Sequence, residues 1–219
     1  MPPIQYRWLA KFLKIFFHLL YHQFAWTYDL VSGIVSLGMW NSWIRSSLPK
    51  LPGPRVLELG HGPGHLQSAL FNTPAQAFGL DLSPQMGKLA VQRLKRIGHS
   101  PRLTNADTKN LPYPANTFDQ LVATFPTEYI VDPETITETH RVLKTGGQVI
   151  IIPVAWITGQ SFFHRLAAWL FKITGQAGEI TDDIYTKGLA QYETRGFNLQ
   201  IEKLPHKQST ILMLTATKR

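Results

Sequence analysis

From residue 52 onward, short apolar segments alternate with segments of helical character. The run 147–154 is almost wholly apolar, as expected for a strand buried on both faces, and Ser83 followed by Pro84 is a typical helix start. Strands and helices in alternation form a parallel sheet with right-handed crossovers. The pattern predicts an α/β fold with a doubly wound sheet. We expect its strands at 55–59, 77–82, 102–105, 118–125, 147–154, 197–204 and 209–218.

The last two expected strands are joined only by residues 205–208. This connection is too short for a parallel crossover, so the pair must form an antiparallel hairpin. The sequence therefore predicts a mostly parallel, seven-stranded sheet that ends in an antiparallel hairpin. Helices are expected at 65–71, from residue 84, from 132 to about 144, at 161–173 and from residue 181.

The chain has 219 residues, which is enough for one compact domain with a sizeable core. It has no cysteine, which excludes disulfides, cysteine-ligated zinc and thiol catalysis and suits a reducing cytoplasm. Its formal net charge of +8 indicates an anionic partner, such as a membrane surface, a nucleic acid or a charged ligand. The histidines show no spacing with acids that would build a zinc site, so we expect no metal.

A loop with the sequence Gly-His-Gly-Pro-Gly, residues 60–64, follows the first expected strand. Glycines here let the backbone turn tightly and approach a nucleotide ligand at the carboxyl edge of the sheet. The dinucleotide fingerprint Gly-x-Gly-x-x-Gly would need a glycine where His65 stands. Glu58 adds a carboxylate, which suits the cationic amino-acid end of S-adenosylmethionine better than a pyrophosphate. The cofactor-binding residues expected here are Glu58, Gly60, Gly62 and Gly64.

Two further acids follow the next expected strands. Asp81, at the end of the second strand, is placed to accept hydrogen bonds from both ribose hydroxyls, a role that acids also have in dinucleotide sites. Asp107, just past the third strand, can accept from the adenine amino group. The three acids together favour S-adenosylmethionine over a nicotinamide cofactor. The alternatives for each acid are a salt bridge, a helix cap or a surface turn.

Residues 7–22 combine a basic stripe with a broad apolar surface at helical spacing. No stretch approaches the about 20 largely uncharged residues that a transmembrane span requires. Two interpretations stay open: the helix caps the substrate side of the core, or it lies in a membrane interface with basic residues at anionic head groups. We expect an N-terminal amphipathic helical segment at 1–51 and the cofactor-binding domain at 52–219.

Several motifs resemble those of class I S-adenosylmethionine-dependent methyltransferases, and within them the ubiquinone/menaquinone C-methyltransferase family, over about residues 24–154. They are Val56-Leu57-Glu58-Leu59-Gly60-His61-Gly62-Pro63-Gly64, Gly79-Leu80-Asp81-Leu82-Ser83, Ala106-Asp107, Leu111-Pro112-Tyr113, Asn116-Thr117-Phe118-Asp119 and Arg141-Val142-Leu143-Lys144-Thr145-Gly146-Gly147. The resemblance implies a Rossmann-like methyltransferase fold, S-adenosylmethionine as cofactor and S-adenosylhomocysteine as product. It also implies that Tyr28 helps to close over the cofactor, that Thr108 and Phe125 border adenine and methionine, and that Leu82 belongs to the site.

The likeness weakens where the methyl acceptor should bind. After the fourth expected strand the chain reads Thr124-Phe125-Pro126-Thr127-Glu128-Tyr129, whereas the quinone enzymes carry a glycine and a basic residue in this stretch. The expected helix at 161–173 and the N-terminal helix would line an apolar entrance. Bacterial phospholipid N-methyltransferases resemble the same family, so both a phospholipid amine head group and a quinone-like ring are candidate acceptors.

Methyl transfer from a sulfonium is an in-line displacement with a neutral leaving group, so positioning supplies much of the acceleration. An acceptor hydroxyl, carbon acid or protonated amine still needs a base. The candidates are Glu128, Tyr129, His61, His18 and His22.

We expect methyl transfer to an apolar, membrane-derived small molecule or lipid. The alternative is a non-catalytic, membrane-associated module that binds S-adenosylmethionine. The expected location is the cytoplasm, with peripheral contact at the inner face of the membrane through residues 7–22. No nucleic-acid partner is expected.

Overall fold

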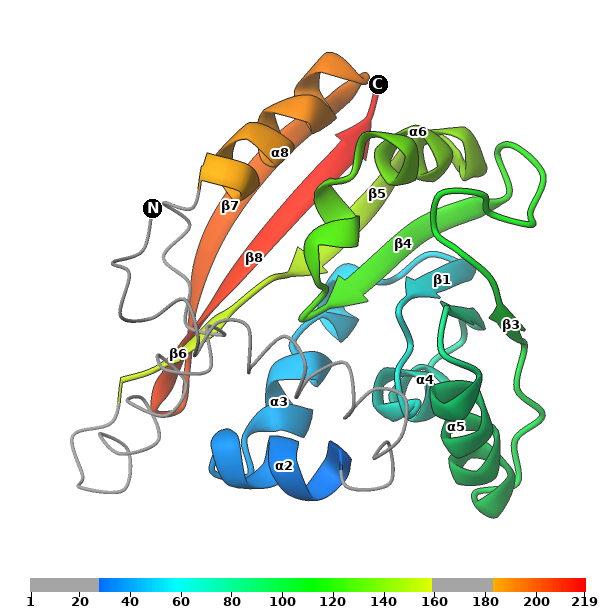
Figure 1. Ribbon diagram of the computed structural model, residues 1–219, viewed down its shortest axis with the longest axis vertical. Helices are drawn as coiled ribbons and strands as arrows, with labels where there is room; N and C mark the ends of the chain where they lie inside the picture. Colours follow the sequence, from blue (N-terminus) through cyan, green and yellow to red (C-terminus); the bar gives the residue numbers. More distant parts are fainter. Residues whose placement is uncertain (1–27, 159–182) are drawn as a thin grey trace, which may run out of the picture.

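A central sheet organises the computed structural model, which describes residues 28–158 and 183–219 (Figure 1). Its strands are β1 (Arg55–Leu59), β2 (Gln76–Asp81), β3 (Leu103–Asn105), β4 (Phe118–Thr124), β5 (Leu143–Ile152), β6 (Ala155–Ile157), β7 (Phe197–His206) and β8 (Ser209–Lys218). The helices are α2 (Tyr28–Val35), α3 (Trp40–Arg45), α4 (His65–Leu70), α5 (Pro84–Arg96), α6 (Pro133–Val142) and α8 (Asp183–Thr194), with short 3-10 turns η3 (Leu48–Lys50) and η4 (Glu128–Val131).

The strand order is β3-β2-β1-β4-β5-β8-β6, and β7 pairs with the other edge of β8. Strands β1 to β5 run parallel, and β8 runs antiparallel to both β5 and β7. The predicted doubly wound, mostly parallel sheet with a C-terminal hairpin is thus confirmed. In such a sheet the strand order reverses between β1 and β4, and ligands bind at the carboxyl edge beside that point.

A short eighth strand, β6, extends the path of β5. Strand β5 pairs with the second half of β8, and β6 pairs with residues 209–211 at its start. Pro153 separates the two strands, and it lacks the backbone N–H that a continuous ladder requires. The apolar run 147–154 predicts a single strand, so this division is a correction by the structure.

Helices cover both faces of the sheet (Figure 1). Leu57 and Leu59 point to a core shared with α6 and α8, whereas Val56 points to a second core shared with α3 and α4. Successive side chains of a strand point to opposite faces, so a sheet with helices on both faces buries both sets of side chains. Trp40, Trp43 and Ile44 of α3 belong to the second core, so this part of the chain before residue 52 packs directly on the sheet.

Several expected boundaries move by a few residues. Helix α6 ends at Val142 and β5 begins at Leu143, although the sequence predicted a helix to about residue 144 and a strand from 147. Gly146 has a φ of +75°, and the pairing register with β4 shifts nearby, so the glycine pair lies within an irregular strand rather than before it. Both expected helix starts are capped: Ser83 accepts from Met86 N at 3.3 Å, and Asp132 accepts from Glu134 N at 2.9 Å.

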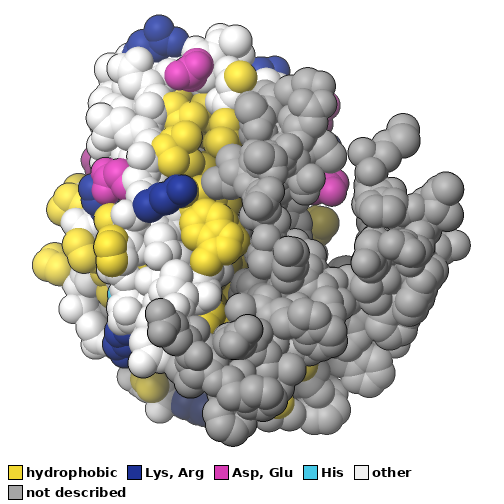
Figure 2. Space-filling view, turned by 90° about the vertical axis from the view of Figure 1, so that its left-hand side faces the viewer, with side chains coloured by type: hydrophobic (Ala, Val, Ile, Leu, Met, Phe, Trp, Pro, Cys, Tyr) yellow, Lys and Arg dark blue, Asp and Glu magenta, His cyan; other side chains and the backbone are white. Residues whose placement is uncertain are grey.

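The expected helices at 7–22 and 161–173, with His18 and His22, lie outside the described residues. Within the described ranges, every helix is too short or too polar to cross a bilayer. The predicted division between residues 51 and 52 stays a prediction. Figure 2 looks onto the hairpin side of the molecule and shows a strip of hydrophobic side chains.

Candidate cofactor site

The glycine loop between β1 and α4 has a left-handed backbone at each glycine. The φ angles are +73° at Gly60, +51° at Gly62 and +84° at Gly64, a region that residues with a Cβ avoid. The backbone N–H groups of Gly60 and His61 both donate to the carbonyl oxygen of Leu80, at 2.7 and 3.2 Å. The loop is therefore tied to the end of β2.

Two glycines also allow close contacts that a side chain would block. A Cβ on Gly60 would lie 2.5 Å from Tyr129 Oη, and a Cβ on Gly64 would lie 2.9 Å from the Cβ of Ala90 in α5. A Cβ on Gly62 would meet nothing within 4 Å. Tyr129 therefore packs against Gly60 and Ala90 packs against Gly64, whereas the space beside Gly62 is open.

Asp81, at the end of β2, is held by two backbone groups. Its Oδ2 accepts from Gly62 N and its Oδ1 from Ser83 N, each at 2.8 Å. Each carboxylate oxygen keeps a second acceptor position, so the group can also accept from two neighbouring hydroxyls. Leu82 follows with 65% of its surface exposed, a large value for a leucine, and offers an apolar face beside that carboxylate.

Asp107 and Thr108 lie in the turn after β3. Asp107 is exposed, and its Oδ1 accepts from Lys109 N at 3.0 Å. Thr108 is buried, with its hydroxyl 2.9 Å from that of Thr135 in α6. The carboxylate of Asp107 is thus open to a ligand, whereas the Thr108 hydroxyl is engaged inside the protein.

Glu58 is only 2% exposed and accepts a 2.8 Å hydrogen bond from Gln67 Nε2. Burial raises the pKa of Glu58 to about 8 and the charge of Asp81 adds to this, while the Gln67 bond opposes it. The amide oxygen of Gln67 is buried and has no hydrogen-bond partner among the described residues. A buried carboxylate beside an unpaired amide oxygen is a set of acceptors suited to a cationic donor.

His61 lies beneath the loop rather than on its open side. It is 4% exposed, its Nδ1 is 2.7 Å from the carbonyl oxygen of Gly62, and a Cβ on Gly79 would lie 3.1 Å from its Cδ2. Burial lowers the pKa of His61, although the charge of Asp81 and backbone hydrogen bonds oppose this. The ring therefore packs between the loop and Gly79 of β2.

Two cavities border the loop. The first has a volume of about 30 Å³. Its lining residues come from α3, the glycine loop and the ends of β1 and β4: Trp40, Ile44, Glu58, residues 60–63, His65 and Thr124. This space is close to that of one water, so an amino-acid group requires its walls to move apart. The second has a volume of about 420 Å³ and is lined by His61, Asp81, Ser83 and parts of α5 and β3. Its lining includes Asp81 but not Leu82 or Asp107, the residues expected to border adenine.

An aromatic wall stands at the end of β4. Phe125, with a φ of +49°, stacks on Trp40 at 4.2 Å between ring centroids and lies 6.0 Å from Trp43. Glu128 is exposed, and the Tyr129 hydroxyl donates to the carbonyl oxygen of Leu59 at 2.9 Å. Tyr28 opens α2, and its side chain is not among those described.

The structure brings Glu58, Gly60, Gly62 and Asp81 together as predicted, and adds residues that the sequence analysis missed. Gln67 contacts Glu58, and Trp40 contacts Phe125. No local pattern marks either pair. Within residues 28–158 and 183–219, no three histidine, aspartate or glutamate side chains gather to hold a metal.

These groups fit S-adenosylmethionine. A carboxylate with two free acceptor positions suits the ribose diol, buried acceptors suit the ammonium, and the open backbone at Gly62 leaves room for close approach. The fit rests on the chemistry of the donor and acceptor set, and the amino-acid end needs the small cavity to widen.

Comparison with known proteins gives the same cofactor. A family model for a methyltransferase domain matches residues 57–151. The ubiquinone/menaquinone biosynthesis C-methyltransferase UbiE of Geobacter sp. (strain M21) is 32% identical over 160 residues, which cover 69% of this chain and 68% of that protein.

Solved structures share the fold. One is a Methanococcus maripaludis protein whose structure is described as that of an S-adenosyl-L-methionine-dependent methyltransferase. It has a TM-score of 0.65 at 17% identity, and the match covers 89% of this chain and 93% of that one. Phosphoethanolamine N-methyltransferase 2 of Haemonchus contortus, solved with phosphomonomethylethanolamine and S-adenosylhomocysteine, has a TM-score of 0.55 at 17% identity, covering 83% of this chain and 53% of that one. The chain therefore belongs to the class I S-adenosylmethionine-dependent methyltransferases, in the family of the ubiquinone/menaquinone biosynthesis C-methyltransferases, and its cofactor is S-adenosylmethionine.

Proposed function

We propose that this methyltransferase acts on an apolar, membrane-derived acceptor, either a phospholipid amine head group or a quinone-like ring. The observation that carries the proposal is the aromatic wall of Trp40, Trp43 and Phe125 beside the glycine loop. Trp43 is fully buried and Trp40 is 8% exposed, so the partly buried ring of Phe125 is the part of this wall that a ligand can reach. An aromatic ring favours an apolar ligand and can also contact a cationic amine. The same wall borders the small cavity through Trp40.

In this proposal each cofactor-binding residue has one task. Asp81 accepts from the ribose hydroxyls, Glu58 faces the ammonium, and the backbone at Gly60, Gly62 and Gly64 admits the amino-acid end. Leu82 and Asp107 contact adenine through an apolar face and a carboxylate. Thr108 borders adenine through its backbone, because its hydroxyl is bonded to Thr135. Tyr28 and Phe125 close the methionine side.

The bound cofactor supplies an electrophilic methyl group on a sulfonium. The protein's own task is to align the acceptor with that methyl group and to exclude water. Of the base candidates, His61 is beneath the loop and Tyr129 donates to Leu59, so neither is directed at an acceptor by the described contacts. Glu128 is exposed on η4, three residues after Phe125 in the chain, and is our candidate for accepting a proton.

Two of the similar proteins have different acceptors, and the water-soluble acceptor of the second shares only its amine head group with a phospholipid. The Geobacter relative is named for methylation in ubiquinone and menaquinone biosynthesis, and the Haemonchus structure holds phosphomonomethylethanolamine. The stretch from Thr124 to Tyr129 lacks the glycine and basic residue expected of the quinone enzymes. This departure favours the phospholipid amine.

Incubation with a total lipid extract and S-adenosylmethionine that carries a deuterated methyl group tests the proposal. Mass spectrometry should find a lipid that gains one or more labelled methyl groups, and Asp81→Asn protein should label much less of it at a limiting cofactor concentration. Labelling of aqueous metabolites with no labelled lipid or quinone would reject an apolar acceptor. Glu128→Gln should slow transfer to a protonated amine while cofactor binding stays unchanged.

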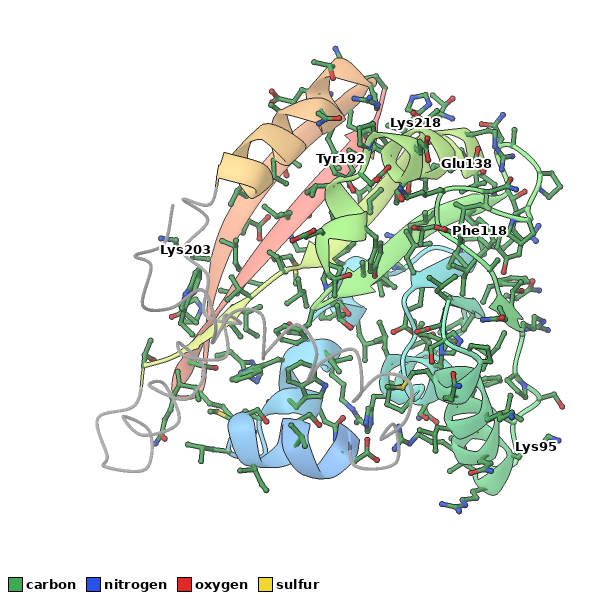
Figure 3. The ribbon with its side chains drawn as sticks, in the orientation of Figure 1. Lys95, Phe118, Glu138, Tyr192, Lys203 and Lys218 are labelled. Atoms are coloured by element: carbon green, nitrogen blue, oxygen red, sulfur yellow. The ribbon has the colours of Figure 1, made fainter. Side chains whose placement is uncertain are left out.

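We also propose contact with the inner face of the membrane through residues 7–22. Support comes from a second basic surface: the chain has no acid between Asp81 and Asp107, and Lys88, Lys95 and Arg96 of α5 are exposed. Lys95 projects away from the fold (Figure 3). Such cations are attracted to anionic head groups. This contact would place the protein on the cytoplasmic side.

Liposome sedimentation tests this contact. Anionic vesicles should retain the wild type, and the double variant Lys11→Glu with Lys14→Glu should be retained less. The matched control is Lys203→Glu with Lys207→Glu, which changes net charge equally on the hairpin. Equal retention of the Lys11/Lys14 variant and the wild type would leave the N-terminal segment as a cap of the core.

A further inference from the structure

The described side-chain contacts that join helix α2 to the rest of the protein are polar. None of its residues whose exposure is described is buried, and Ile34 is 60% exposed. Helix α3, which follows it, is anchored by Trp40, Trp43 and Ile44 in the core. The turn between the two helices places Leu37 and Gly38 in the left-handed region, with φ values of +51° and +76°. A poorly buried helix therefore joins an anchored one through a sharp turn.

One residue of α2, Asp29, reaches across to the glycine loop. Its Oδ1 lies 2.8 Å from Nε2 of His65, and its Oδ2 is bonded to Nη2 of Arg93 in α5. The other guanidinium nitrogen of Arg93 donates to the carbonyl oxygen of Pro63 at 2.6 Å. The hydrogen bond from His65 is the main reason that the pKa of Asp29 is lowered. Asp29 and Arg93 thus hold the loop on both sides of Gly64.

The two loop residues that are held also line the small cavity. Pro63 and His65 both border the space of about 30 Å³ beside Glu58. Gly64, between them, packs against Ala90, one turn before Arg93 in α5. The contact made by Asp29 therefore fixes the wall that must move when the amino-acid end of the cofactor enters.

We propose that Asp29, acting through His65 and Arg93, is a positioning residue that holds α2 against the glycine loop and thereby controls the entry and retention of S-adenosylmethionine. The side chain of Asp29 is 51% exposed and that of Arg93 26%. An ion pair with this exposure is weak and is screened by salt, so it can open and close readily. Elements of low local stability are those that move at binding sites. The inference does not depend on which acceptor is methylated.

Binding of S-adenosylhomocysteine, which is not consumed, tests the proposal. Asp29→Asn should weaken binding of the product and of the cofactor about threefold to tenfold, mainly through faster dissociation. Hydrogen exchange over residues 28–35 should become faster in the free variant. The matched control is Glu202→Gln, which removes an exposed ion pair with Lys50 at 3.2 Å outside this site. Asp29→Glu should restore part of the lost affinity.

A double-mutant comparison separates positioning from general destabilisation. Asp29→Asn with Arg93→Gln should weaken binding by less than the product of the two single effects, because both changes break one network. High salt should narrow the difference between the wild type and Asp29→Asn. The proposal would be overturned if Asp29→Asn and Glu202→Gln released S-adenosylhomocysteine at the same rate and showed the same hydrogen-exchange rates over residues 28–35. If Asp29→Asn does not fold, Arg93→Lys replaces it in the test, because lysine keeps the charge but lacks the planar guanidinium group. S-adenosylhomocysteine that dissociates from Arg93→Lys as slowly as from the wild type would overturn the proposal.

Discussion

The Tyr129 hydroxyl donates a 2.9 Å hydrogen bond to the carbonyl oxygen of Leu59, and in doing so lies directly over Gly60. The tyrosine comes from η4, after β4, and the glycine from the loop after β1. This contact joins η4 to the cofactor loop. It also explains why position 60 has no room for a side chain.

Gly60→Ala should therefore lose cofactor binding and lower the melting temperature. The new Cβ would lie 2.5 Å from Tyr129 Oη, and alanine disfavours a φ of +73°. Adding Tyr129→Phe removes the closest atom and leaves the next at 3.3 Å, so the double variant should recover part of the stability but not the binding. Calorimetric unfolding and a binding titration measure the two effects. A Gly60→Ala protein that binds normally would contradict the geometry.

Asp81→Asn should weaken S-adenosylmethionine binding by about tenfold to a hundredfold. Hydrogen bonds to a charged group are worth about 1.5–3 kcal/mol each, and the amide turns a donor toward Gly62 N or Ser83 N. The fold should persist, because Asp81 is at the end of β2 and partly exposed. Isothermal titration measures the affinity, with Glu202→Gln as the control. Equal affinities would remove Asp81 from the site.

Cofactor binding near neutral pH should release a proton from Glu58. The pKa of Glu58 is raised to about 8 in the free protein, so the carboxyl is protonated at pH 7. An ammonium placed beside it favours the charged form and lowers that pKa. Affinity should therefore rise from pH 6 to about 7.5, a range in which the ligand's amino group remains largely protonated.

Titration calorimetry in two buffers of different ionisation enthalpy measures this proton. The wild type should show release of up to about one proton at pH 7. Glu58→Gln, which mimics the neutral acid, should show none and should bind with little dependence on pH. Equal proton release by both proteins would place the ammonium away from Glu58.

Tyr192→Phe should lower stability without changing cofactor affinity. Tyr192 is fully buried in α8, and its hydroxyl donates to the carbonyl oxygen of Ile130 in η4 at 2.9 Å (Figure 3). Its loss should cost about 1 kcal/mol, which lowers the melting temperature by about 2–4 °C. Thr194→Ala, at the exposed end of the same helix, is the control. Equal melting temperatures of Tyr192→Phe and the wild type would show that the bond contributes no net stability.

Local sequence patterns were enough to predict the sheet. The alternation of strands and helices, the short connection at 205–208 and the caps at Ser83 and Asp132 each depend on neighbouring residues alone. The same holds for the glycine loop and for Asp81, because both follow directly from the ends of parallel strands. The predicted ends of helices and strands differ from the structure where a strand is irregular, as at Gly146 and Pro153.

Contacts between distant segments came only from the structure. Gln67 reaches Glu58, Tyr129 reaches Leu59, and Asp29 reaches Arg93 across separations of 9, 70 and 64 residues. Long separations leave no periodic signal in the sequence, since each partner is a common residue type in its own segment.

The chain order of strands and helices, the glycine loop and the acids that fit S-adenosylmethionine can all be predicted from the amino-acid sequence, because backbone preference and hydrophobic periodicity are local properties. Packing in three dimensions sets the burial of Glu58, the burial of His61 against β2, and the contacts of Asp29 with His65 and Arg93. Those features depend on which side chains the packed sheet brings within a few ångströms, and packing sets both the solvation of a charge and the partners it can reach.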